Sequence, residues 1–184
     1  MSFKPLTPNN WDQPDETSTI FARHSPIVGM VQMNGNDWAR AFLAVELSES
    51  VPADVRGLFA VARGTLVYGW FFYPLYALGE EQLHRVADAA VAHRYRELDG
   101  PLGKRGYLPL LARRIQWLEA EGIIPSDLAP RWNAIRELRN IGSHPDFQML
   151  HPPGDVLTSL KTVAEAVGEL FASPRLAPQS SCNR

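Results

Sequence analysis

The chain has 184 residues, of which 45% are hydrophobic and 21% are charged, and this balance suits one globular domain with a buried core. Its formal net charge of -2 at pH 7 excludes a positive field over the whole molecule, so any basic surface must be local. Residues 85–140 carry ten Lys and Arg against seven Asp and Glu, whereas residues 1–50 carry three against six. A basic surface is therefore expected in the second half of the chain.

Cysteine usage and hydropathy indicate the compartment. Cys182 is the single cysteine, which leaves no intramolecular disulfide and no thiolate metal cluster and favours a reducing environment. The N-terminal residues lack the apolar segment of a signal peptide. The longest apolar stretch, residues 66–78, is shorter than the roughly 20 residues that span a bilayer. We expect a cytoplasmic protein that does not enter the membrane.

Periodicity divides the chain into three parts. Residues 1–35 are rich in Pro, Asn, Asp and Thr, which predicts an extended or partly ordered segment. Residues 36–172 repeat apolar side chains at helical spacing, and residues 173–184 form a tail. No stretch shows a convincing strand alternation, and no internal repeat is found. The predicted fold class is all-α, an up-and-down bundle of four to five helices.

The first half of the bundle is marked by its caps and prolines. Asn36 or Asp37 is expected to cap a helix over about 36–50. Pro52 is placed to open a second helix, whose nearly continuous apolar residues indicate burial on several sides. Because Pro74 lacks a backbone donor, this helix should kink or stop there and then resume.

Three further helices are expected. Pro109 stands near the start of one and Gly122 just past its end. The next covers about 129–142 and loses helical propensity at its final glycine. After a Pro-rich loop, Asp155 is predicted to cap the last helix, which ends before Pro174.

The most informative stretch is residues 139–145, Arg-Asn-Ile-Gly-Ser-His-Pro. It sets a permanent cation and a titratable base five positions apart, the two groups needed to bind a phosphodiester and move protons around it. In an unbroken helix these side chains would point about 140° apart. A helix that ends near Gly142, with Pro145 biasing His144 toward extended backbone, would let the imidazole fold back toward Arg139.

The end of the predicted penultimate helix resembles the ribonuclease motif of the HEPN superfamily, with Arg139 and Asn140 followed by His144. The resemblance covers about residues 37–171. The resemblance implies a homodimer whose two motifs face each other in one cleft and cut RNA without a metal or other cofactor. It also implies a toxin or phage-defence setting, with an antitoxin or regulatory protein as a possible partner. One departure is Asp146, where some family toxins carry a tyrosine that a partner nucleotidyltransferase modifies.

The resemblance also suggests roles for individual residues. Arg139 would bind the scissile phosphate and stabilise the charge that develops on it. His144 would act as general base or acid, and Asn140 would orient one of the two. Arg136, one turn before Arg139, could add a contact to the RNA backbone. Because each chain supplies one such histidine, a two-proton mechanism is easiest if both protomers contribute.

A structural interpretation of the motif stays open. Arg139 could pair with a carboxylate such as Glu137 or Glu81, while Asn140 and His144 cap helix ends. The domain would then be a non-catalytic HEPN-like module that binds a protein partner or a nucleotide, or a purely structural helical dimer.

Four other titratable residues lie in the helix that is expected to resume after Pro74. Glu80 and Glu81 are typical of the acidic first turn of a restarted helix, with a reach into the cleft as the alternative. His84 and His93 are nine positions apart, on opposite faces of a helix, so they are not expected to share a metal. The sequence predicts no metal site.

Overall fold

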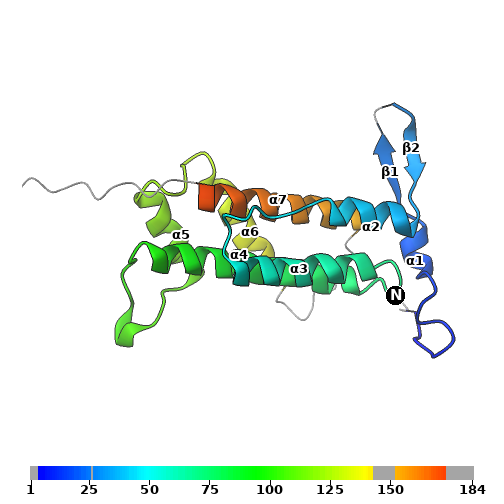
Figure 1. Cartoon of the computed structure of the whole chain (residues 1–184), viewed down its shortest axis with the longest axis horizontal. Coiled ribbons are helices and arrows are strands. Elements are labelled where there is room, and N and C mark those ends of the chain that lie inside the picture. The colour runs from blue at the N-terminus through cyan, green and yellow to red at the C-terminus, as the bar shows by residue number, and fades with distance from the viewer. Residues whose placement is uncertain (1–3, 26, 143–151, 173–184) are drawn as a thin grey trace, which may run out of the picture.

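The computed structural model describes residues 4–25, 27–142 and 152–172, with the backbone alone for residues 23 and 138–142. Its elements in chain order are α1 (Glu16–Thr19), β1 (Ala22–Ser25), β2 (Gly29–Gln32), α2 (Gly35–Leu43), α3 (Ala53–Tyr68), α4 (Leu75–Glu97), the 3-10 helix η1 (Lys104–Gly106), α5 (Leu111–Ala120), α6 (Ala129–Gly142) and α7 (Pro153–Ala172) (Figure 1). The predicted all-α helical bundle is confirmed, with one small two-stranded sheet added to it. Within the described ranges, no helix is both long and apolar enough to cross a membrane.

The α3–α4 hairpin forms where the prolines predict it. Pro52 is the N-cap of α3, and Pro74 is the N-cap of α4 after the turn that follows Tyr68. The two helices approach closely because Gly79 has no side chain: a Cβ at this position would collide with the buried side chain of Leu66. Close packing of this kind is sensitive to a single added methyl group.

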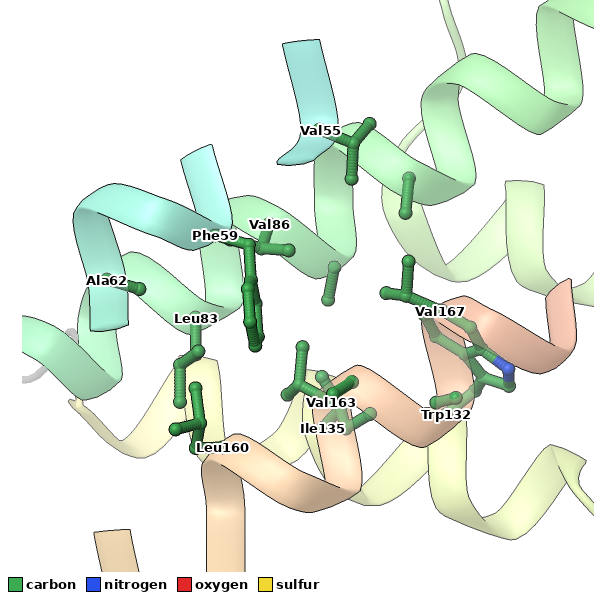
Figure 2. Packing of buried hydrophobic residues seen from close by; sticks show 14 of the residues in the cluster. Val55, Phe59, Ala62, Leu83, Val86, Trp132, Ile135, Leu160, Val163 and Val167 are labelled. Carbon is green, nitrogen blue, oxygen red and sulfur yellow. The ribbon is translucent and has the colours of Figure 1, made fainter. Parts of the chain in front are cut away.

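The core lies where α3, α4, α6 and α7 converge. Figure 2 shows side chains from all four helices meeting there: Val55, Phe59, Ala62, Leu83, Val86, Trp132, Ile135, Leu160, Val163 and Val167. All of them are buried. Burial of this apolar surface is the main favourable term in the free energy of folding.

Contacts along α7 define the directions of its neighbours. Ser159 bonds to Glu80 near the start of α4, and Phe171 packs edge-on against His93 farther along it, so α4 and α7 run parallel. On α6, Arg131 pairs with Glu169 near the far end of α7. One turn later, Ile135 lines a cavity together with Ser159 near the start of α7, so α6 runs antiparallel to both helices.

Some predicted helix ends are wrong. The cap of α2 is Asn34, not Asn36 or Asp37: Asn34 Oδ1 accepts from Asp37 N at 3.0 Å, and Asp37 Oδ2 accepts from Asn34 N at 3.2 Å. The helix ends at Leu43, before residue 50, and Arg63 of α3 donates to the carbonyls of Leu43 and Val45 at this end.

Asp155 is likewise not the cap of the last helix. It lies inside the first turn of α7, which begins at Pro153. An acidic side chain there still favours the helix through the macrodipole.

The N-terminal segment contains a β-hairpin that the sequence analysis did not predict. Strands β1 and β2 pair antiparallel, with Ala22 opposite Gln32 and Ser25 opposite Gly29. Each strand has only four residues, and the side chains of Met30 and Val31 are exposed. A strand that buries neither face leaves no alternation of apolar and polar residues to detect.

The segment that precedes the hairpin is bound to the α3–α4 turn. The buried carboxylate of Asp15 accepts hydrogen bonds from Thr17 N at 3.0 Å and from Tyr73 N at 2.9 Å. Ser18 Oγ donates to Gly69 O at 2.9 Å. These buried bonds fix the chain against the end of the bundle at which α4 begins.

The close approach of α3 and α4 can be tested with two glycines. We expect Gly79→Val to lower the free energy of unfolding by about 1–3 kcal/mol, because the new side chain overpacks against Leu66. Gly64→Ala on α3 is the control: nothing lies within 4 Å of an added Cβ there, so this variant should gain about 0.5–1 kcal/mol from lower chain entropy. Urea unfolding measures both, and equal effects would contradict the close approach.

Candidate functional site

The motif begins in the last turn of α6. Arg139 and Asn140 have helical backbone, and α6 continues through Gly142 as predicted. The side chains of Arg139 and Asn140 lie outside the described part of the structure, and His144 lies outside the described residues altogether. The proposed convergence of Arg139 and His144 therefore stays a prediction.

The neighbours of α6 show which end of the bundle the motif occupies. Arg131 Nη1 is 2.9 Å from Glu169 Oε2, near the C-terminal end of α7. Ile135, one turn later, lines a cavity together with Thr158 and Ser159 from the N-terminal part of α7. A further turn along α6, the backbone at position 139 reaches the end of the bundle where α4 and α7 begin.

This cavity, of about 200 Å³, lies between α4, α6 and α7. Its lining combines apolar side chains with one carboxyl group, one imidazole and three hydroxyl groups: Glu80, Leu83, His84, Ile135, Thr158, Ser159, Thr162 and Val163. Polar groups that converge in an otherwise apolar pocket are typical of a binding or active site.

Glu80 is the most buried ionisable group of the cavity. It is only 9% exposed, and its Oε1 accepts a 2.7 Å hydrogen bond from Ser159 Oγ. A carboxylate in apolar surroundings is stable only when it is hydrogen-bonded or paired with a charge. His84 lies four positions later on the same face of α4, so two titratable groups line one wall.

The structure corrects the expectation for the two glutamates. Because α4 begins at Leu75, directly after the turn, Glu80 and Glu81 lie in its second turn and not in an acidic first turn. Glu80 is buried against α7, whereas Glu81 is exposed. Of the two residues, Glu80 is the one that reaches the cavity.

Arg136, predicted to contact RNA, is half-buried on α6. Its Nη2 lies 3.6 Å from Glu137 Oε1, and its side chain is 32% exposed. A partly exposed pair of this length adds little stability, so the guanidinium can exchange Glu137 for another anion at little cost. Glu137, one of the two carboxylates suggested for Arg139, thus faces a different arginine.

Sequence reasoning missed the cavity although two of its residues carried a signal. Glu80 and His84 are spaced four apart, so both lie on one face of α4, next to the buried side chains of Leu83 and Ala87. Ser159 carried none, because nothing local shows that α7 lies parallel to α4. In the described ranges, no three His, Cys, Asp or Glu side chains come together as metal ligands would.

Comparison with known proteins gives one match. A family model described as "Domain of unknown function (DUF4145)" matches residues 82–183. The match covers α5, α6, α7, the 139–144 motif and every residue of the cavity except Glu80. No curated protein and no solved structure matches the chain.

The Ser159 hydrogen bond can be tested with a neighbouring hydroxyl as control. We expect Ser159→Ala to lower the free energy of unfolding by about 1–3 kcal/mol, because it removes a hydrogen bond from a buried carboxylate. Thr158→Ala should change it by less than about 0.5 kcal/mol, since the Thr158 hydroxyl bonds only to Gly154 O of its own helix and is exposed. Chemical denaturation measures both, and a Ser159→Ala variant as stable as the parent would refute the assignment.

Proposed function

The chain belongs to the DUF4145 family of domains of unknown function. We propose that it is a metal-independent endoribonuclease. Its reaction centre would lie at the end of the bundle where α6 finishes and α4 and α7 begin. Arg139, Asn140 and His144 would carry the chemistry.

One observation supports the proposal most directly. Helix α6 carries Arg139 and Asn140 one turn beyond Ile135, which lines a cavity that also contains a buried carboxyl group and an imidazole. A cation that enters this cavity would meet the carboxyl group of Glu80. A carboxylate in that place can hold a guanidinium in one orientation, as phosphate recognition requires.

The proposed reaction is transfer of the phosphodiester to the neighbouring ribose hydroxyl. The 2'-oxygen forms a bond to phosphorus while the bond to the leaving 5'-oxygen breaks, so one proton is removed and another is donated. His144 would carry one of these protons. Arg139 would stabilise the charge on the phosphate oxygens, and Asn140 would orient one of the two side chains.

The second proton has two candidate carriers. In a homodimer with a shared cleft, His144 of a second copy of the chain would supply it. The cavity adds His84, an imidazole from the same chain. A His84→Ala variant that retains full cleavage would favour the dimer.

The other candidate is a non-catalytic module that binds a protein partner or a nucleotide, and the size of the cavity between α4, α6 and α7 argues against this cavity as a nucleotide site. Pockets that enclose small ligands are usually about 300–1,000 Å³. The cavity beside Ile135 measures about 200 Å³, which is too small to enclose a whole nucleotide. An extended RNA that presents one phosphate to the site needs no such enclosure.

Incubation of the purified protein with mixed RNAs in EDTA tests the nuclease. We expect cleavage by the parent, and a loss of about 10²–10⁴-fold in His144→Ala and Arg139→Ala, the range for removal of a proton-transfer or charge-stabilising group. Arg131→Ala is the matched control, because its guanidinium on the same helix pairs with Glu169 instead.

The control should cut as well as the parent, with circular dichroism showing that all variants are folded. Absence of cleavage in the parent, or cleavage that survives both motif substitutions, would exclude the nuclease and favour the non-catalytic module.

A further inference from the structure

The loop between α4 and α5 concentrates positive charge. From residue 94 to residue 114 the chain carries six Lys and Arg against two Asp and Glu. Two of these cations are used within the fold: Arg94 pairs with Glu97 at 2.8 Å, and Arg114 pairs with Asp88 at 2.6 Å. The other four are exposed, and in the described part of the chain none of them forms an ion pair: Arg96, Lys104, Arg105 and Arg113.

An open pocket of about 1000 Å³ lies beside these cations, and of the four it is Arg96 that lines it. The lining pairs one cation with one acidic residue and adds an aromatic ring among small and apolar residues: Arg96, Asp99, Gly100, Pro101, Leu102, Gly106, Tyr107 and Leu108. The Tyr107 ring is 71% exposed, unusually high for an aromatic side chain. Exposed cations that lie next to an exposed aromatic ring are a common arrangement for binding single-stranded nucleic acid, and here the cations come mainly from the loop beside the pocket.

The base of the loop is held in place by the bundle. Tyr95 Oη donates to Pro101 O at 2.5 Å, and Gly100 N donates to Tyr95 O at 2.9 Å. The Tyr95 ring packs edge-on against Trp117 of α5 at 4.8 Å between centroids. The loop thus projects from the end of the bundle on a fixed base (Figure 1).

Arg105 has a backbone conformation that side chains rarely adopt. Its φ of 62° and ψ of 21° lie in the left-handed region. Holding a non-glycine residue there costs about 1–3 kcal/mol, and such residues cluster at functional sites. The turn is closed by Gly106 N donating to Gly103 O and Gly103 N donating to Tyr107 O, which sets Arg105 at its exposed tip.

We propose that this loop surface binds the phosphate backbone of single-stranded nucleic acid through Arg96, Lys104, Arg105 and Arg113, with Tyr107 stacking on a base. It would act as a binding site separate from the proposed reaction centre. Arg96 follows Glu80 by 16 residues of continuous helix, or about 24 Å along α4. That the bound strand is RNA and not DNA rests on the proposed function. That the loop binds a single strand does not depend on it.

Binding can be measured without cleavage. The probe is a labelled single-stranded RNA oligonucleotide, the protein is the full chain carrying His144→Ala, and fluorescence anisotropy is read over a range of salt concentrations in EDTA. With Lys104→Gln and Arg105→Gln together, we expect the slope of log affinity against log salt to become shallower by about 1.4, at about 0.7 for each phosphate that the protein no longer neutralises.

The control for charge is Arg56→Gln with Lys161→Gln, which removes the same two charges from exposed positions on α3 and α7. Tyr107→Ala should weaken binding about 5- to 150-fold if the ring stacks on a base. Tyr68→Ala is its control, because Tyr68 is also exposed, at 60%, but lies on α3. Both control variants should bind as the parent does.

Three results would overturn the assignment. The loop variants could bind with unchanged affinity and slope, or the charge control could weaken binding as much as the loop pair does. Polyglutamate of equal charge could bind as tightly as RNA, with the same affinity for the parent and for Tyr107→Ala. That result would identify an acidic protein as the ligand. Binding by the loop in a protein that never cuts RNA would leave this inference standing and remove the nuclease.

Discussion

Helix α4 has to bury most of its surface, and the rest of the structure depends on this. Helices α3, α5, α6 and α7 all pack on it. Small side chains make this possible: Gly79 admits α3, and Ala87, Ala90 and Ala92 are buried farther along the helix. Because neighbours cover most of α4, a polar residue on its buried faces must find its partner within the protein. The same helix carries the cavity residues near its start and leads into the basic loop at its end.

Glu80 illustrates the consequence. A carboxylate buried among apolar side chains would destabilise the bundle unless it is hydrogen-bonded. The bond from Ser159 meets part of that need and joins α4 to α7 in one parallel register. A shift of α7 by one residue would rotate Ser159 away from Glu80. The group that gives the cavity its chemistry thus also helps to define how the helices pack, which couples the candidate site to the fold.

Local signals were sufficient to predict the helices of the bundle, though not all of their ends or the short α1, whereas non-local contacts were not predictable. Pro52 and Pro74 mark the limits of α3 and α4 because proline acts on its own backbone. The β-hairpin escaped prediction because its short strands expose their side chains. The cavity escaped because it depends on the parallel placement of α4 and α7, which no periodicity encodes. The 139–144 motif could be found by its residue types, whereas Glu80 and Ser159 needed the three-dimensional arrangement.

The separation of those two residues has a consequence for biosynthesis. Ser159 and Glu80 are 79 positions apart, and α7 follows every other described helix in the chain. A ribosome therefore releases α4 well before α7 can pack beside it, and the cavity stays open to water until then. If this end of the bundle cuts RNA, the growing chain holds an unfinished site while it is still surrounded by ribosomal RNA and messenger RNA. Order of synthesis would then protect the machinery that makes the protein.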